Sequence, residues 1–333
     1  MKARLAAFAL LFGVGALCWI AAELIVARLG LLEYPPAMNR GHATRGYTLR
    51  PGFRGESSFG IPFRVSAQGF RSPEVAIPKA AGTRRVLVLG DSVTWGAGVP
   101  EETTFSRRLE TALRSELACP VEVINAGISG YGSVEELDVL QNEGLRFEPD
   151  VVLVYHVEND NQVLGHASGE LARFVKDHVI YRSYLIDAML YAFRNVRWRL
   201  HAARAGGDRE AYAAEQRAWD QRPGTQASLD ALREIVRLTQ QHGARAILAS
   251  HPNSLTDPSI DALRNRLLRE LAAESGTPFV DVGPALVPYR DRDIVVSKVD
   301  LHPNAFAHGV IAEALRPAVR DALGCAPRAG AAR

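Results

Sequence analysis

Four short stretches of the sequence carry polar side chains of the kinds used in ester chemistry. They are GDSVTWG at 90–96, NAGISGYG at 125–132, HVEND at 156–160 and VDLHPN at 299–304. A serine hydroxyl becomes an effective nucleophile when an imidazole takes its proton and a carboxylate fixes the tautomer of that imidazole. The stretches hold all three groups, which suits attack on an ester carbonyl. Ser92 taken alone has a second interpretation, as a turn residue that caps a helix.

An alternation of strands and helices is expected to position these stretches. Strands are predicted at 85–89, 121–125, 150–155, 245–249 and 278–282, and helices at about 103–117, 133–145, 226–242, 258–274 and 305–323. Such an alternation predicts a mainly parallel sheet covered by helices on both faces. Three of the stretches then follow carboxyl ends of strands, where α/β sheets bind their ligands, and the fourth precedes the last helix.

The four stretches, in this order, resemble the SGNH/GDSL hydrolase superfamily over most of residues 84–325. The resemblance implies a flavodoxin-like three-layer α/β/α sandwich that hydrolyses or transfers esters. It implies that Ser92 is the nucleophile and His302 the general base. It also implies an oxyanion hole built from the backbone amides of Ser92 and Gly130 and the side chain of Asn159.

The sequence departs from the superfamily pattern at two places. Val157 stands where the pattern usually has glycine, and a side chain there is expected to narrow the site or shift its loop. The acid of the pattern usually lies three residues before the histidine, where this chain has Val299, whereas Asp300 lies two residues before His302. We expect Asp300 to orient His302, with Asp293 as the alternative.

The amino-terminal segment predicts contact with a membrane. Lys2 and Arg4 precede residues 5–22, a run without charge that is long enough to span a bilayer, and Glu23 is expected near an interface. The two basic residues predict a cytoplasmic amino terminus and a catalytic body outside the cytoplasm, periplasmic or extracellular. Secretion after cleavage of a signal peptide is the alternative.

The domain organisation follows from these segments. Residues 1–29 are the transmembrane anchor or signal peptide, 30–83 a small β-rich lead-in, 84–325 the hydrolase-like domain and 326–333 a flexible tail. A helical insertion is expected at about 163–222, because apolar residues recur at helical spacing from Tyr181 to Trp198. We expect this helix to pack on the domain, with a lid or acyl-group platform that touches the membrane as the alternative. An exported compartment permits a disulfide between Cys119 and Cys325, and two separate thiols are the alternative.

The composition of the 333-residue chain argues against several classes of partner. A net charge of +2 without a clustered basic face speaks against nucleic acid. His302 and His308 lack metal-binding spacing, so no metal is expected. The glycines after Ser92 match no nucleotide-binding pattern, so no cofactor is expected. The expected partners are an ester-bearing small molecule, a lipid or an acylated glycan, together with the membrane.

The function implied by the resemblance is a serine esterase or acylhydrolase that works through an acyl-enzyme on Ser92. The alternative is an O-acyltransferase or O-acetylesterase that modifies cell-envelope glycans. A third possibility of a different class is a non-catalytic envelope binding protein that keeps the fold.

Overall fold

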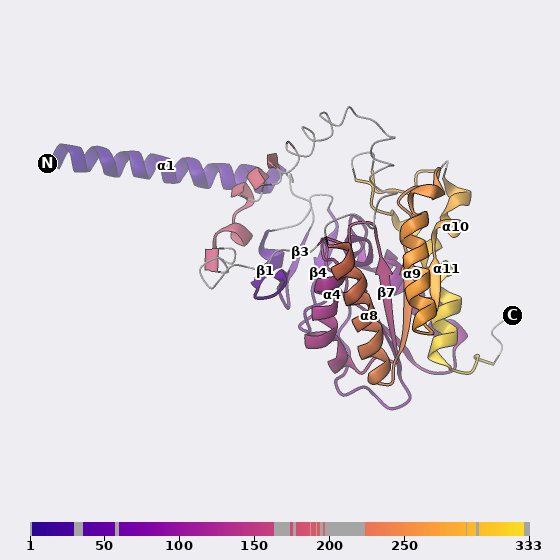
Figure 1. The fold of residues 1–333 in the computed structure, drawn as a ribbon. Helices are drawn as coiled ribbons and strands as arrows, with labels where there is room; N and C mark the ends of the chain where they lie inside the picture. The colour runs from indigo at the N-terminus through magenta and orange to yellow at the C-terminus, as the bar shows by residue number, and fades with distance from the viewer. Residues whose placement is uncertain are drawn as a thin grey trace.

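The computed structural model describes residues 2–29, 36–56, 60–162, 174–175, 178–186, 188–190, 192–193, 196, 224–290, 292–297 and 300–329. Its centre is a sheet of five parallel strands (Figure 1). The strands are β5 (Arg84–Gly90), β6 (Val121–Asn125), β7 (Val151–His156), β8 (Arg245–Ser250) and β9 (Phe279–Asp281). Their order in the sheet is β6-β5-β7-β8-β9. The chain thus reverses its direction of travel across the sheet beside β5, and ligands bind outside the carboxyl ends at such a point.

Helices cover both faces of the sheet, and the expected α/β sandwich is confirmed. One face carries α4 (Ser133–Val139), α8 (Thr225–Gln241) and α9 (Ala262–Glu274). The other face carries α3 (Phe105–Glu116), α10 (Gly283–Leu286) and α11 (Ala305–Leu323). Because both faces are covered, β5 and β7 are apolar along almost their whole length and do not alternate.

Short helical pieces complete the described part of the domain. They are α2 (Ser92–Trp95), η1 (Pro36–Met38), η2 (Glu101–Thr103), η3 (Leu140–Gly144), η4 (Leu145–Phe147), η5 (Ile180–Arg182), η7 (Pro258–Ile260) and η8 (Val287–Tyr289). The predicted helix at 133–145 is therefore α4 followed by one wider and one tighter turn.

The lead-in forms two antiparallel hairpins that pack on the sheet domain. Strand β1 (Asn39–His42) pairs with β2 (Gly46–Leu49), and β3 (Arg54–Glu56) pairs with β4 (Pro62–Arg64). Its buried apolar side chains join the core on the face of α4 and α8; they include Met38, Leu49, Phe63 and Phe70. The lead-in therefore reaches the same core that supports β5.

Helix α1 (Lys2–Leu29) extends away from this body (Figure 1). Its segment Arg4–Leu29 has a mean hydropathy of 2.3, and none of its most apolar stretch is buried. Among the residues described, it is the one helix long and apolar enough to cross a membrane, and a signal sequence has the same character.

The predicted insertion at 163–222 lies largely outside the described residues, and so does Trp198. Its described part has helical pieces between residues 174 and 196. The expected packing of this helix on the domain is wrong at Met189, Phe193 and Val196, whose side chains are exposed.

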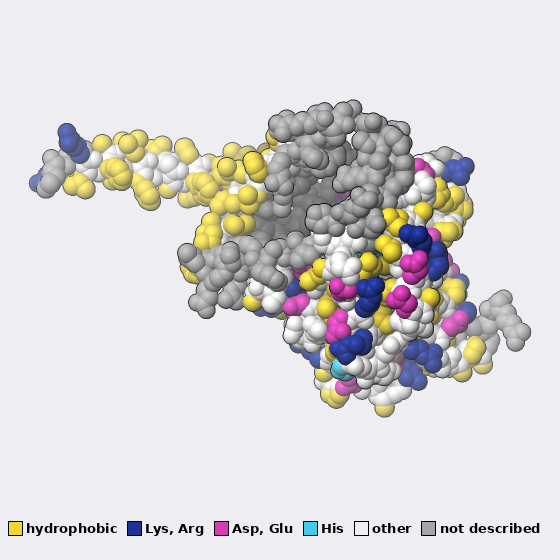
Figure 2. Space-filling model, in the orientation of Figure 1, with side chains coloured by type: hydrophobic (Ala, Val, Ile, Leu, Met, Phe, Trp, Pro, Cys, Tyr) yellow, Lys and Arg dark blue, Asp and Glu magenta, His cyan; other side chains and the backbone are white. Residues whose placement is uncertain are grey.

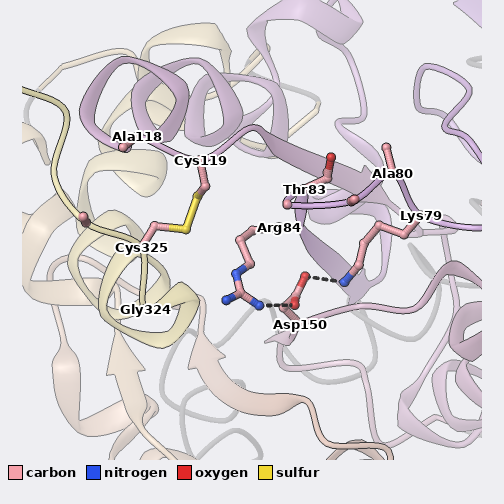
Figure 3. A pocket seen from close by; sticks show the side chains of 12 residues that line it. Lys79, Ala80, Thr83, Arg84, Ala118, Cys119, Asp150, Gly324 and Cys325 are labelled. Carbon is pink, nitrogen blue, oxygen red and sulfur yellow. Dashed lines mark hydrogen bonds and ion pairs between the residues drawn. A yellow bond between two sulfur atoms is a disulfide. The ribbon is translucent and has the colours of Figure 1, made fainter.

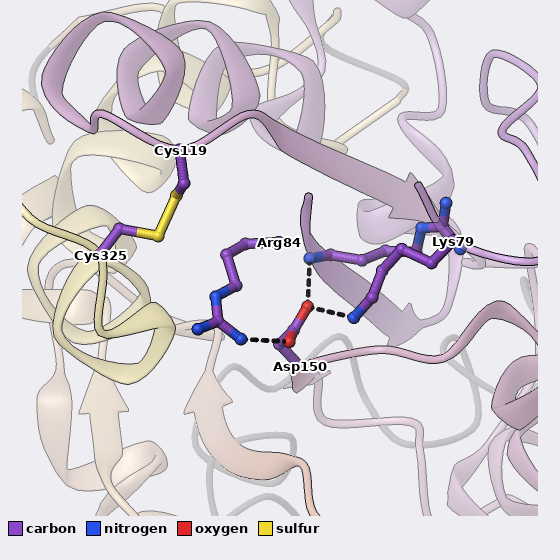
Figure 4. The surroundings of a disulfide bond; sticks show 6 residues. Lys79, Arg84, Cys119, Asp150 and Cys325 are labelled. Atoms are coloured by element: carbon purple, nitrogen blue, oxygen red, sulfur yellow. Dashed lines mark hydrogen bonds and ion pairs between the residues drawn. A yellow bond between two sulfur atoms is a disulfide. The ribbon is translucent and has the colours of Figure 1, made fainter. Parts of the chain in front are cut away.

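The amino edge of the sheet lies opposite the carboxyl edge where ligands are expected. Cys119 and Cys325 form a disulfide there, which joins the chain after α3 to the chain after α11 (Figure 4). A neighbouring hollow of about 570 Å³ is lined by Lys79, Arg84 and Asp150 (Figure 3). Both basic groups contact the Asp150 carboxylate, at 2.7 and 2.8 Å, so this carboxylate offsets one of the two positive charges. This hollow is remote from Ser92.

Candidate active site

Ser92 lies in a tight turn between the central strand β5 and the short helix α2. Asp91 caps that helix, because its carboxylate accepts the backbone N–H of Val93 at 2.9 Å. Gly90 has a φ of 155°, and a Cβ there would lie 2.8 Å from Thr94 Cβ and 3.0 Å from the carbonyl oxygen of Tyr155. Glycine is therefore required for the turn. The capping role falls to Asp91, which leaves the Ser92 hydroxyl available at the carboxyl edge of the sheet.

A chain of hydrogen bonds links Ser92, His302 and Asp300. His302 Nε2 lies 2.8 Å from Ser92 Oγ, and His302 Nδ1 lies 2.6 Å from Asp300 Oδ1. The same carboxylate oxygen accepts the backbone N–H of His302 at 3.1 Å. The imidazole is thus fixed with Nδ1 toward the acid and Nε2 toward the hydroxyl, the orientation that a general base needs. Ser92 Oγ also lies 3.0 Å from Asp91 Oδ2.

The loop that carries His302 is held by its own backbone. Val296 N–H donates to the carbonyl of His302 at 2.9 Å, and Asp300 N–H donates to Ser297 Oγ at 3.0 Å. Asn304 then caps α11 by accepting the N–H of Ala307 at 3.1 Å. These bonds bring Asp300 against the imidazole even though it lies only two residues before His302.

Asp293, the alternative acid, is placed differently. It is exposed, and its backbone carbonyl accepts a hydrogen bond from Asn304 Nδ2 at 2.8 Å. Its contribution to the loop is therefore through the main chain, while the carboxylate bonded to the imidazole is that of Asp300.

The electrostatics of Asp300 suit its contact with an imidazole. Burial by itself raises the pKa of this carboxyl, but the hydrogen bonds and charge of His302 outweigh it and hold the pKa below its usual value. Asp300 is consequently ionised at neutral pH. An ionised acid in this position is able to stabilise an imidazolium, the form that an imidazole takes when it accepts a proton from a hydroxyl.

The two other predicted site residues, Gly130 and Asn159, lie on the loops after β6 and β7, the strands on either side of β5. Gly127 is buried and its N–H already donates to Asn125 Oδ1 at 3.0 Å. Gly130, in contrast, is exposed on the loop of residues 126–132, the β6 loop, with a φ of 80°. Asn159 is half-exposed on the β7 loop. These positions are compatible with donors on both sides of Ser92.

Val157 does not narrow the site as expected. Its side chain is buried in the apolar core beneath the loop, and its N–H donates to Asp160 Oδ2 at 2.9 Å. Asp160 is itself buried and so organises the β7 loop from below. A valine is accommodated at this position because the side chain points into the core.

Two residues of the lead-in support the site, and neither was singled out from the sequence. Tyr47 Oη donates to the carbonyl of Ser129, which belongs to the same peptide group as the N–H of Gly130. Arg71 is buried and donates to the carbonyls of Trp95, Gly96 and Val99, at 2.9, 2.7 and 2.6 Å. The lead-in therefore holds both the β6 loop and the helix that begins with Ser92.

The remaining histidines near the sheet edge have structural contacts. His251 Nδ1 lies 2.8 Å from Tyr155 Oη, and burial with the nearby charge of Arg264 lowers its pKa to about 3. His308 accepts the N–H of Phe105 at 3.2 Å, and burial lowers its pKa to about 3. Both rings are neutral at pH 7. Among the described residues, no group of three or more His, Cys, Asp or Glu is arranged to hold a metal ion.

Comparisons with known families and solved structures give matches over the part of the chain that holds the candidate site. A family model described as the GDSL-like Lipase/Acylhydrolase family matches residues 88–310. No curated protein matches the chain significantly.

Several solved structures are similar to this chain at low identity. The crystal structure of TesA has 17% identity over 72% of this chain and 99% of that chain, with a TM-score of 0.47. The psychrotrophic esterase EstA from Pseudoalteromonas sp. has 16% identity over 72% and 99%, with a TM-score of 0.45. Axe2, an acetylxylan esterase from Geobacillus stearothermophilus, has 16% identity over 73% and 95%, with a TM-score of 0.42.

Proposed function

This chain belongs to the GDSL-like lipase/acylhydrolase family and is a hydrolase, and from that premise we propose that it cleaves carboxylic esters through an acyl-enzyme on Ser92. The observation that carries the proposal is the hydrogen-bonded chain from Ser92 through His302 to Asp300, with distances of 2.8 and 2.6 Å. A serine, an imidazole and a carboxylate so arranged form a nucleophile with its base and the group that orients the base.

The first half of the reaction forms the acyl-enzyme. Ser92 Oγ attacks the ester carbonyl carbon while its proton passes to His302 Nε2, and Asp300 stabilises the resulting imidazolium. The carbonyl oxygen becomes an oxyanion, for which we propose the N–H groups of Ser92 and Gly130 and the amide of Asn159 as donors. Each such donor is worth about 3 kcal/mol of barrier. The oxyanion then collapses, the C–O bond to the alcohol breaks, and His302 gives its proton to the leaving oxygen.

The second half releases the acid. His302 Nε2 takes a proton from water, the water oxygen attacks the acyl carbon, and the bond to Ser92 Oγ breaks as His302 returns the proton to it. A sugar hydroxyl in place of water would give acyl transfer by the same steps. The proposed substrates are esters of small molecules, lipids or acylated glycans.

We propose further that α1 anchors the protein in a membrane with the catalytic body outside the cytoplasm. Two observations support this arrangement. Lys2 and Arg4 precede the apolar segment, as is usual for a cytoplasmic end. The Cys119–Cys325 disulfide is of the kind that persists in oxidising compartments.

The test uses the purified full chain with p-nitrophenyl acetate and a fluorophosphonate probe. Ser92→Ala should lower the turnover number at least about 10³-fold and abolish labelling, because the nucleophile is removed. Ser115→Ala, an exposed serine on α3, is the matched control and should behave as wild type. Equal turnover of wild type and Ser92→Ala, without labelling of either, would favour a non-catalytic binding protein. Acyl transfer to an added glycan in excess of hydrolysis would make the protein an acyltransferase.

A further inference from the structure

The apolar helix α1 is tied to the helical insertion through its one acidic residue. The Glu23 carboxylate accepts hydrogen bonds from Ser183 Oγ and from the backbone N–H of Leu185, the latter at 3.2 Å. Ser183 Oγ also accepts the N–H of Ile186 at 3.0 Å. Glu23 and Ser183 thus cap the helical residues that begin at 184. A carboxylate that would be costly at the end of the apolar stretch of α1 accepts hydrogen bonds from donors of the insertion.

The position of Glu23 along α1 determines the depth, relative to a membrane that α1 spans, at which this contact lies. At about 1.5 Å per residue, Leu5 and Glu23 are about 27 Å apart along the helix, close to the roughly 30 Å thickness of the hydrocarbon core. If Lys2 and Arg4 lie at the cytoplasmic interface, Glu23 reaches the opposite interface. Ser183 and Leu185 then lie at the membrane surface.

The insertion exposes apolar side chains next to this contact. We call them the insertion face; they are Phe174, Val175, Val179, Met189, Leu190, Phe193 and Val196, all exposed. Figure 1 shows the helical pieces of this region close to the carboxyl-terminal end of α1, and Figure 2 shows hydrophobic side chains along α1 and around that end. Seven exposed apolar side chains within residues 174–196 are more than the scattered apolar positions of an ordinary surface, and such groups mark surfaces that contact a partner or a membrane.

The composition of the insertion indicates which kind of surface the insertion face contacts. Residues 171–200 contain six Lys or Arg against two Asp, and six aromatic residues. Helical segments that combine basic, aromatic and aliphatic residues lie in the interface of anionic bilayers, with the apolar side chains about 5–10 Å deep. The insertion face lies at the depth where α1 leaves the membrane, which contact with lipid requires and contact with a protein partner does not.

We propose that the insertion face lies in the interface of an anionic lipid bilayer beside α1. The protein would then contact the membrane at two joined places, a spanning helix and an interfacial segment. Two contacts fix the orientation of the catalytic body relative to the membrane, which a single helix and a short linker would not do. This inference rests on the proposed anchoring by α1, and it is independent of the Ser92 chemistry.

The experiment places a fluorescent reporter on the insertion face of the full chain. Cys18 is the free cysteine and Cys119 is in the disulfide, so a Cys18→Ala background leaves no reactive thiol. Phe193→Cys in this background is labelled with an environment-sensitive dye and the protein is reconstituted into vesicles of phosphatidylcholine and phosphatidylglycerol. Leu24→Cys on α1 reports insertion of the anchor, and Arg233→Cys, exposed on α8, is the matched control on the body.

The proposal predicts that lipids with a nitroxide near the headgroup quench the dyes at 193 and 24 to a similar extent, and leave the dye at 233 unchanged. Quenching at 193 should weaken when phosphatidylglycerol is omitted. Quenching at 24 without quenching at 193 would overturn the proposal while leaving the anchor in place. Shielding of the dye at 193 from aqueous iodide without lipid quenching would mean that the body or a second copy covers the face, which also overturns it. Absence of quenching at both positions would remove the anchoring together with the inference. Hydrolysis of p-nitrophenyl acetate by the same samples reports the Ser92 chemistry separately.

Discussion

Replacing Asp300 with alanine tests how the imidazole is held. Asp300 accepts two hydrogen bonds from His302, at 2.6 Å from Nδ1 and 3.1 Å from the backbone N–H, and its side chain is 12% exposed. In the proposed transition state the carboxylate faces an imidazolium. Unit charges about 4 Å apart interact by about 4 kcal/mol at an effective dielectric constant of about 20. The loss of this interaction corresponds to a fall of about 10³-fold in the turnover number.

The assay is steady-state hydrolysis of p-nitrophenyl acetate by Asp300→Ala, with Asp293→Ala as the matched control. Asp300→Ala should lower kcat by about 10³-fold with little change in KM, because the interaction develops as the proton moves. Asp293→Ala should stay within about two-fold of wild type, since the exposed Asp293 serves the loop through its backbone carbonyl. Thermal melts would verify that both variants are folded. A larger loss for Asp293→Ala than for Asp300→Ala would refute the assignment.

Three further substitutions test the supports of the site and of the fold. Tyr47→Phe removes the hydrogen bond that fixes the peptide group of the β6 loop, so kcat should fall about 5- to 10-fold in the same assay with KM unchanged; an unchanged kcat would contradict this. Burial raises the pKa of Asp150, but hydrogen bonds led by that of Lys79 outweigh this effect and hold the pKa below its usual value. The ionised carboxylate therefore stabilises the fold above about pH 4, and this stabilisation is lost as the pH falls through the lowered pKa. Asp150→Asn should lower the free energy of unfolding in urea by about 2 kcal/mol at pH 7 and by much less near pH 3, and a pH-independent loss would count against the ionic explanation. Replacing Cys119 and Cys325 together by serine should lower that free energy by about 2–5 kcal/mol at unchanged kcat, because the bond closes a loop of 206 residues; equal stability would show that it contributes nothing.

The elements that carry the site could be predicted from the sequence because their signals are local. Strand β5 contains the apolar run 86–89 closed by Gly90, a pattern typical of a strand that is buried on both faces. The placement of Ser92 at the end of that strand follows from the turn. The position of His302 just before the last helix is likewise predicted, and Asn304 caps that helix in the structure.

The contacts that complete the site could not be predicted, because they join segments far apart in the chain. Tyr47 and Arg71 are single polar residues in an irregular segment, and their roles depend on how the hairpins pack against the β6 loop and α2. We expect from the sequence that the side chain of Val157 narrows the site or shifts its loop, whereas the β7 loop turns this side chain into the core. The helical spacing around Phe193 leads us to expect a helix packed on the domain, whereas the side chain of Phe193 is exposed, because periodicity alone does not distinguish a face that packs on the body from one that does not.

The central claim, an acyl-enzyme on Ser92, is tested most directly by trapping that intermediate. The full chain would be mixed with excess p-nitrophenyl acetate, quenched in acid within the first turnovers and digested for mass spectrometry. We expect the peptide that contains Ser92 to gain the mass of one acetyl group in wild type, and to gain nothing in Ser92→Ala. Ester hydrolysis by wild type with acetylation at another residue, or with the same turnover in Ser92→Ala, would contradict the account.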